Sequence, residues 1–318
     1  MISYKKKINN SPFFSNLRLW LVLFTFFSAL AVGGFLISSY KDKISYDSSS
    51  DGSEVAELQE QTIPPDVQEK IDQEKRALAQ KPSNVLGSQS PVAVRVPILI
   101  YHYIEYIQDK NDKTRMALNT TPYTLEEEVK TLANAGYTFM TNNELVAVLR
   151  GKAKLPKKPI LLTFDDSYRD FYIDAYPILK KYHAKATQFV ISGFLGYKNH
   201  LDINQLQEIA RDGLVEIGDH TVHHVGLKGM PLQKVTDEIL ESKVAIEQII
   251  HKPVVSFAYP FGAFDQPTLE VVKNSGFFSA MSTIPGVQQK QENNYFLSRL
   301  RPGGRTGQVL LTWLDNQK

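Results

Sequence analysis

The chain has 318 residues, of which 36 are Lys or Arg and 34 are Asp or Glu, and it contains no cysteine. This near balance of charge argues against a nucleic-acid partner, because proteins that bind nucleic acid carry a marked basic excess. The lack of cysteine excludes disulfide bonds, thiolate metal sites and a cysteine nucleophile, so any metal must be bound by His, Asp or Glu.

An apolar segment stands near the N-terminus, at residues 19–37, and contains no charged residue. About 20 such residues span the hydrocarbon core of a bilayer. Residues 1–18 carry basic residues without an acidic one, whereas acidic residues accompany the basic ones after the segment. The positive-inside bias therefore predicts a single-pass anchor in the cell membrane, with a cytoplasmic N-terminus and an extracytoplasmic remainder.

A cleaved signal peptide is the alternative interpretation of this segment, and it would give a secreted protein. Ala29 and Ala31 have the spacing of a cleavage site. We favour the uncleaved anchor, because the apolar run continues to Ile37 and is long for the apolar part of a signal peptide. The lipid bilayer is thus an expected partner of the chain.

Residues 38–91 are rich in Ser, Gln and charged residues and poor in aromatic ones. Such a composition buries too little apolar surface to offset the entropy cost of ordering. We therefore expect a flexible extracytoplasmic linker, with one short helix near residues 66–80. The composition changes at residue 92, and residues 92–318 are expected to form one folded domain.

Short apolar runs alternate with amphipathic helical patterns in this domain. Expected strands lie at residues 96–100, 160–164, 186–191, 215–218, 254–259, 277–281 and 296–301. Three expected helices begin at Thr124, Thr141 and Asp202, and another ends near Tyr182. Two more span residues 232–250 and 267–275. The repeated order of strand and helix predicts parallel strands in a distorted or incomplete (β/α) barrel of seven to eight strands, similar to a TIM barrel. No glycine-rich phosphate loop follows a strand, which argues against a nucleotide fold.

Two adjacent carboxylates, Asp165 and Asp166, follow the buried strand at 160–164. In (β/α) barrels the catalytic groups gather at the carboxyl ends of the strands. Adjacent residues of a regular strand point to opposite faces, so both acids can serve one site only if the strand ends and the chain turns there. The alternative is that one of them merely caps the following helix.

A histidine pair, His220 and His224, follows the strand at 215–218. Histidines four residues apart can face one metal ion, and neutral imidazole is the commonest metal ligand. Together with one of the two aspartates they give three ligands and leave a position for water, as in catalytic metal sites. Such a pair alone is more often a surface or core feature, but the aspartates at another strand end favour the metal.

A third segment, Tyr259-Pro260-Phe261-Gly262, ends the expected strand at 254–259. Aromatic rings at the mouth of a barrel can stack on sugar faces or form the wall of a pocket. A hydrophobic strand that ends in a Pro-Gly turn is the alternative interpretation of this segment.

In this order, the three segments resemble the polysaccharide deacetylase family with the NodB-homology domain, carbohydrate esterase family four. The resemblance covers roughly residues 96–302. It implies a distorted barrel that removes acetyl groups from N-acetylglucosamine-type polymers, with Asp165 as the general base. The implied ligands of one divalent metal ion, usually Zn²⁺, are Asp166, His220 and His224. The residues implied to form the wall of the substrate groove are Tyr259, Pro260 and Phe261.

The chain departs from the family pattern at two positions. Many members have an Arg at the place of Ala258, which pairs with the base, and Arg299 and Arg301 are the candidates to replace it. Those members also have a late His as general acid, whereas the last histidine here is His251 at the end of an expected helix. His102 follows the first expected strand and is the candidate acid, as in the branch of the family that deacetylates poly-N-acetylglucosamine. A buried histidine of the core is the alternative for His102.

The sequence therefore predicts a membrane-anchored, metal-dependent polysaccharide N-deacetylase that acts on a polymeric N-acetylated glycan. A carbohydrate-binding barrel that has lost turnover is one alternative, since the usual Arg and late His are missing. Iron oxygenases with two His and one carboxylate share the ligand set, but the second aspartate, which offers a base beside a ligand, favours hydrolysis. His183 and His200 do not stand at the end of an expected strand and receive no role.

Overall fold

The structure, a computed structural model, describes residues 65–80 and 93–317. The expected membrane segment at 19–37 lies outside the described residues, as do residues 1–18 and the first part of the expected linker. Within the part of the chain that is described, no helix combines the length and the apolar character that a membrane crossing requires.

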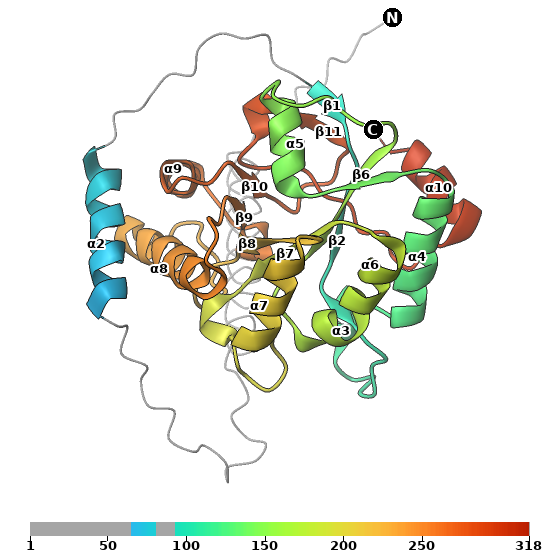
Figure 1. Cartoon of the computed structure of the whole chain (residues 1–318), viewed down its shortest axis with the longest axis horizontal. Helices are drawn as coiled ribbons and strands as arrows, with labels where there is room; N and C mark the ends of the chain where they lie inside the picture. The colour runs from blue at the N-terminus through green and yellow to red at the C-terminus, as the bar shows by residue number, and fades with distance from the viewer. Residues whose placement is uncertain (1–64, 81–92, 318) are drawn as a thin grey trace, which may run out of the picture. The chain divides into compact units, whose positions relative to one another are not determined.

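A parallel sheet of seven strands forms the centre of the fold (Figure 1). Six strands follow the order β10-β9-β8-β7-β6-β2, and β5 pairs with β6 off this path. The strands are β2 (Ile98–Tyr101), β5 (Thr138–Met140), β6 (Pro159–Phe164), β7 (Ala186–Val190), β8 (Val215–Asp219), β9 (Ser256–Ala258) and β10 (Ser279–Met281). Every residue of β2, β6 and β7 is buried, as expected for a parallel sheet that is covered on both faces. This parallel sheet is consistent with the predicted distorted or incomplete (β/α) barrel.

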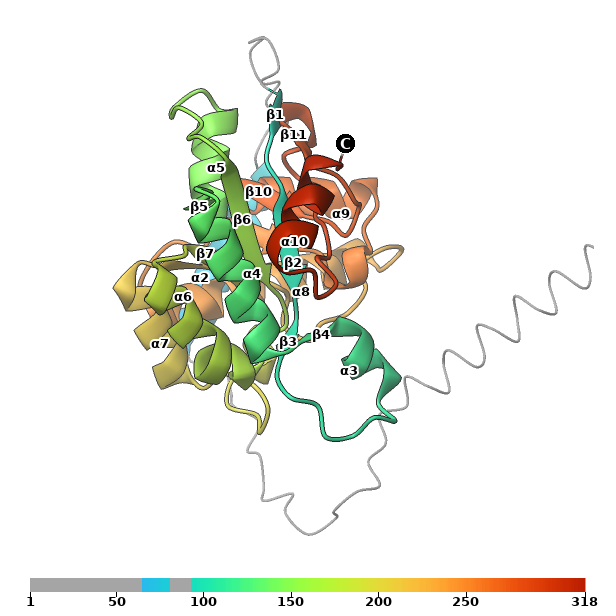
Figure 2. The ribbon, with the colours of Figure 1, turned by 90° about the vertical axis from the view of Figure 1, so that its right-hand side faces the viewer.

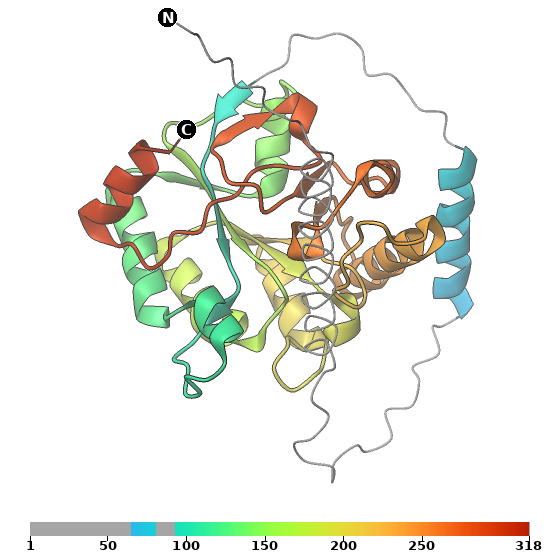
Figure 3. The same ribbon diagram turned by 180° about the vertical axis from the view of Figure 1, so that it is seen from behind.

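The segment at 296–301, expected as the last strand, is not a regular strand in the structure. Its course matters for the site. This segment forms two isolated parallel bridges instead of a ladder, one from Leu297 to Met281 of β10 and one from Leu300 to Leu99 of β2. It therefore spans the gap between the two edge strands of the sheet, and Figure 3 shows it running beside β2. Its irregular backbone leaves Arg299, between the two bridges, buried.

Helices follow most of the strands and cover the sheet (Figure 1). They are α3 (Lys113–Leu118), α4 (Pro122–Asn134), α5 (Asn142–Leu149), α6 (Tyr176–Tyr182), α7 (Ile203–Asp212), α8 (Leu232–Ile250), α9 (Gln266–Asn274) and α10 (Gly307–Asp315). The capping boxes that the sequence predicts for α5 and α7 are present, at Thr141 and Asp202. The start predicted for α4 is wrong: Thr121 caps this helix and Pro122 takes its first position, where proline is favoured.

Shorter elements occupy the two ends of the barrel. One antiparallel pair joins β1 (Ala93–Arg95) to β11 (Gln288–Lys290), and one parallel pair joins β3 (Tyr103–Ile104) to β4 (Asn119–Thr120). Figure 2 shows β1 and β11 at one end and β3, β4 and α3 at the other. Because β2 leads from β1 to β3, the second end is the one toward which the parallel strands point.

Helix α2 (Pro65–Gln80) confirms the short helix expected near 66–80, and it packs against the domain. Its Ile71 is buried against Val244 of α8. Lys75 of α2 lies 2.6 Å from an Asp237 carboxylate oxygen and 3.3 Å from one of Glu241. Part of the expected linker thus belongs to the folded unit.

Candidate active site

The aspartate pair lies where β6 ends, and the backbone turns sharply there. Asp166 and Ser167 have φ angles of 72° and 52°, in the left-handed region that few non-glycine residues adopt. This turn breaks the alternation of the strand, so adjacent carboxylates need not point to opposite faces. Asp165 and Asp166 are both buried, at 3% and 4% exposure.

The histidine pair lies directly after β8, on a second strained turn. Thr221 and His224 have φ angles of 70° and 53°. Within the turn, the Thr221 N–H donates to an oxygen of Asp219 at 2.9 Å, and the His224 N–H donates to the Thr221 hydroxyl at 3.0 Å. His220 is buried, while His224 is partly exposed.

The two turns bring Asp166, His220 and His224 together. The Asp166 Oδ1 atom lies 3.3 Å from His220 Nε2 and 3.1 Å from His224 Nε2. One ligand atom from each residue lies within 4.8 Å of the others. Among the described residues, no other group of three His, Asp or Glu side chains converges in this way.

The protonation of His220 suits a metal ligand. Its Nδ1 lies 2.7 Å from the carbonyl oxygen of Ala258, and a carbonyl can only accept, so Nδ1 carries the proton. In the neutral ring the Nε2 lone pair then faces Asp166 Oδ1, a buried atom that accepts no hydrogen bond. With His220 neutral, these acceptor atoms converge with no proton between them, and a cation stabilises such an arrangement. The residues present therefore fit a divalent metal.

Asp165 has a different partner, Arg299. The guanidinium donates from Nη1 and Nη2 to the two carboxylate oxygens at 2.7 and 2.8 Å, and its Nε donates to the Ser282 carbonyl at 2.8 Å. Burial alone would raise the pKa of Asp165, but the charge and the hydrogen bonds of Arg299 oppose burial, and the pKa lies below its ordinary value. Asp165 is thus ionised at neutral pH and fixed in orientation.

His102 lies after β2, at the same end of the barrel. It is half-buried, and its Nδ1 is a buried atom with no hydrogen-bond partner. Burial lowers its pKa, and the nearby carboxylates of Asp165 and Asp166 oppose this shift without cancelling it. The charges of Asp165 and Asp166 therefore influence the protonation of His102.

Arg301 stands at the same rim and is exposed. Within the described part of the chain it forms no hydrogen bond or ion pair, although the charges of Asp165 and Asp166 act on it. Of the two arginines predicted from the sequence, the structure brings only Arg299 into contact with Asp165.

Tyr259, Pro260 and Phe261, the residues expected in the wall of the substrate groove, differ in their exposure. The Tyr259 side chain is 1% exposed, stacks on Phe264 at 4.5 Å between ring centroids, and donates from its hydroxyl to the Tyr295 carbonyl at 2.9 Å. Pro260 is buried as well. The side chains of both residues therefore pack in the core. Phe261 is 65% exposed, and its ring centroid lies 4.6 Å from that of His224, so it alone of the three borders the site at the surface.

Sequence reasoning missed His200. This residue lies in the loop between β7 and α7, and its Nδ1 is 3.0 Å from the backbone carbonyl oxygen of Asp166. It lies well beyond the end of β7 and belongs to none of the three segments, so the sequence carries no signal for its position.

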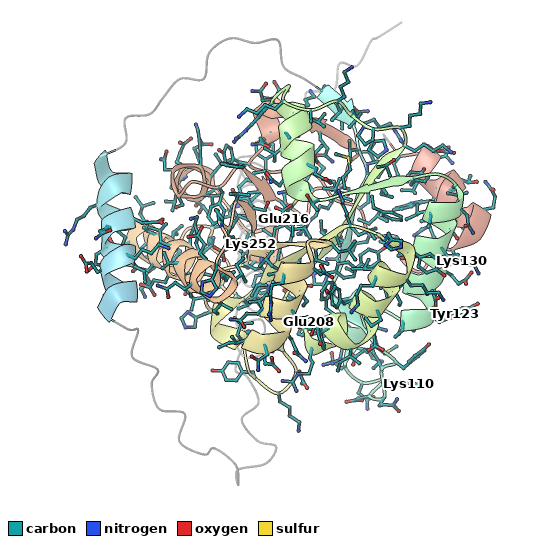
Figure 4. All side chains as sticks on the ribbon, viewed as in Figure 1. Lys110, Tyr123, Lys130, Glu208, Glu216 and Lys252 are labelled. Carbon is teal, nitrogen blue, oxygen red and sulfur yellow. The ribbon has the colours of Figure 1, made fainter. Side chains whose placement is uncertain are left out.

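A cavity of about 210 Å³ lies away from these residues, near the beginning of β8. Glu216 and Lys252, labelled in Figure 4, contribute to its lining. His220 follows the other end of the same strand, so this cavity is separate from the convergent Asp and His side chains.

Comparison with known proteins agrees with the geometry. A family model described as polysaccharide deacetylase matches residues 152–279. YxkH of Bacillus subtilis, which is named for the same family, is 32% identical over 225 residues, which are 70% of this chain and 77% of the relative. Poly-beta-1,6-N-acetyl-D-glucosamine N-deacetylase of Staphylococcus aureus is 26% identical over 220 residues, with coverage of 65% and 75%.

A solved structure shows the same fold at similar identity. The Streptococcus pyogenes deacetylase PplD, in complex with acetate, aligns with a TM-score of 0.65 at 30% identity and covers 70% of this chain and 99% of its own. The chain therefore belongs to the polysaccharide deacetylase family, whose enzymes hydrolyse the carbon–nitrogen bond of acetamido groups.

Proposed function

We propose that the chain is a metal-dependent N-deacetylase of a polymeric glycan that contains N-acetylglucosamine. The observation that carries the proposal is the convergence of Asp166, His220 and His224 beside Asp165, a carboxylate that Arg299 fixes. The Staphylococcus aureus relative, named as a deacetylase of poly-beta-1,6-N-acetyl-D-glucosamine, supports the substrate class.

Asp166, His220 and His224 would bind the metal, and Zn²⁺ suits two imidazoles and one carboxylate. A divalent ion bound there lowers the pKa of water and polarises the carbonyl of the acetamido group. Three protein ligands leave room for water and substrate, as in catalytic zinc sites. The buried setting of Asp166 and His220 strengthens electrostatic interactions at the site.

Asp165 is the proposed general base, which takes the proton of the attacking water. Its two oxygens each accept from Arg299, but a carboxylate oxygen has a second lone pair, so a proton can still be accepted. Arg299 keeps the carboxylate ionised and out of the metal site, which separates the base from the adjacent ligand Asp166.

His102 is the proposed general acid, which gives a proton to the amine nitrogen as the amide bond breaks. Burial lowers the pKa of His102, whereas the charges of Asp165 and Asp166 favour its protonated form. Phe261 beside His224 is the proposed apolar contact for the sugar ring or the acetyl methyl group. Arg301, exposed at the same rim, is available to hydrogen-bond to substrate.

The proposed location is the outer face of the cell membrane, with residues 19–37 as a single-pass anchor. The uncharged apolar run and the basic flank before it support this. A polymeric glycan outside the cell is a substrate that an anchored enzyme can reach. Fractionation of cells that make the full chain, compared with cells that make a chain from residue 38 on, tests the anchor: only the full chain should remain with washed membranes.

Release of acetate tests the enzymatic proposal. The purified full chain, stripped of metal and reloaded with Zn²⁺, should release acetate from poly-N-acetylglucosamine oligomers, and the assay should be repeated on chitooligosaccharides and peptidoglycan. The Asp165→Asn variant is the matched inactive control. Zinc binding without acetate release from any of the three glycans would favour a carbohydrate-binding barrel instead.

A further inference from the structure

The turn that carries Asp166 needs support from elsewhere in the chain. Two consecutive residues, Asp166 and Ser167, lie in the left-handed region, which non-glycine residues occupy only when surrounding structure enforces it. A relaxation of this turn would rotate the Asp166 carboxylate away from His220 and His224. The metal geometry therefore depends on what holds the turn.

The loop between β7 and α7 supplies that support through hydrogen bonds. The Leu201 N–H donates to the Ser167 carbonyl at 2.9 Å, and the Ile191 N–H donates to the Ser167 hydroxyl at 3.3 Å. Two residues after Ser167, the Arg169 N–H donates to the Asn199 carbonyl at 2.8 Å. These bonds hold Ser167 and Arg169 in place, but none of them is made to the backbone of Asp166.

His200 is that group. Its Nδ1 lies 3.0 Å from the Asp166 carbonyl oxygen, which can only accept, so the ring donates from Nδ1. The ring is held between Tyr168 and Phe194, at centroid distances of 5.0 and 5.1 Å. Packing thus fixes the orientation of the His200 ring. Its hydrogen bond is made to Asp166, the residue whose carboxylate faces His220 and His224.

We propose that His200 is a positioning residue for the metal ligand Asp166. Its Nδ1–H fixes the Asp166 peptide in the left-handed conformation and so aims the carboxylate at His220 and His224. This inference rests on the proposed metal site. Groups that orient a ligand commonly change metal affinity by about 10- to 100-fold when they are removed.

Two substitutions separate the hydrogen bond from the packing of the ring. His200→Asn retains an N–H donor at the position of Nδ1 and removes the ring, whereas His200→Phe retains the ring and removes the donor. If the donor is what matters, His200→Phe should lose about 10- to 100-fold in Zn²⁺ affinity and His200→Asn should stay within a few-fold of the wild type. His251→Asn, at an exposed histidine that ends α8, is the control for a general effect of losing a histidine.

Zinc affinity is measured on the full chain by competition with a chelating indicator, and folding is checked by circular dichroism. If His200→Phe does not fold, His200→Ala takes its place in the comparison with His200→Asn. Equal affinity of the donor-free variant and the wild type, or equal losses in His200→Asn and the donor-free variant, would overturn the role assigned to the hydrogen bond. A wild-type chain that binds no zinc would instead overturn the proposed metal site itself.

Discussion

The guanidinium of Arg299 binds both carboxylate oxygens of Asp165, at 2.7 and 2.8 Å, across 134 positions of the chain. Arg299 comes from the irregular segment that spans the gap between β2 and β10, and its side chain is fully buried. The residue that fixes the proposed base therefore belongs to the segment that bridges the two edge strands of the sheet.

Two substitutions of Arg299 should separate its effect on kcat from its effect on the free energy of unfolding. Arg299→Lys keeps the charge but loses the paired hydrogen bonds, so we expect kcat to fall by about 10-fold or more with little change in zinc affinity. Arg299→Met leaves Asp165 buried without its partner and should lower the free energy of unfolding by about 3 to 5 kcal/mol. Steady-state kinetics and urea unfolding measure the two effects. Arg305→Lys, at an arginine outside the site, is the control, and a fully active Arg299→Lys would contradict the role.

The two adjacent aspartates should differ in what they lose on conversion to asparagine. Asp166→Asn removes a proposed ligand and should lower zinc content, because an amide oxygen is a weaker ligand than a carboxylate. Asp165→Asn should retain zinc, since Asp165 contacts Arg299 instead of the histidines, and should lower kcat by about 10²- to 10⁴-fold. Metal analysis and acetate release measure the two properties. Equal zinc loss in both variants would mean that both aspartates bind the metal.

His102→Ala should lower kcat by about 10²- to 10⁴-fold with little change in zinc affinity, because an acid acts on the leaving amine and not on the ligands. His102→Gln, which retains a polar side chain of similar length but cannot act as an acid near neutral pH, should be equally slow. Kinetics with poly-N-acetylglucosamine oligomers measure the effect. Near-normal rates in both variants would mean that another group or water donates the proton.

Glu128 should make stability depend on pH. Burial raises its pKa from 4.5 to about 8, and the hydrogen bond from Tyr101 offsets only part of this shift. Between these two values the folded chain keeps a proton that the unfolded chain has lost, so Glu128 lowers the free energy of unfolding by about 1.4 kcal/mol per pH unit as pH rises.

The Glu128→Gln variant, which mimics the protonated acid, should lose this part of the pH dependence. Urea unfolding at several pH values between 5 and 8 should show the variant gaining on the wild type as pH rises. Glu127→Gln, at the neighbouring half-buried position, is the control and should follow the wild type. Parallel curves for wild type and Glu128→Gln would show that Glu128 ionises freely in the folded chain.

Helix α2 should contribute to stability, although we expect the barrel to fold without it. Ile71 is 1% exposed against Val244, so Ile71→Asp should lower the free energy of unfolding by about 1 to 3 kcal/mol. Gln73→Ala, at an exposed position of the same helix, should have little effect. A chain that begins at residue 92 should remain folded with a lower Tm. An unchanged stability of Ile71→Asp would mean that α2 does not pack on α8 in solution.

Most of the strands and helices, and the order of the three segments that identify the family, could be predicted from the amino-acid sequence. Their signals are local: buried strands are continuous apolar runs, and capping residues such as Thr141 and Asp202 act within one turn of the helix. Because carboxyl ends of parallel strands meet at one rim, residues after β6 and β8 could also be expected to converge.

Which side chains face the site could not be predicted, because it depends on how distant parts of the chain pack together. Arg299 could not be distinguished from Arg301 by sequence, since the choice depends on which of them lies between the bridges to β2 and β10. Tyr259 turns inward because Phe264 and the Tyr295 carbonyl bind it there, and His200 reaches Asp166 through a loop that has no periodic pattern. Each of these outcomes depends on contacts between residues far apart in the chain, for which local residue patterns carry no information.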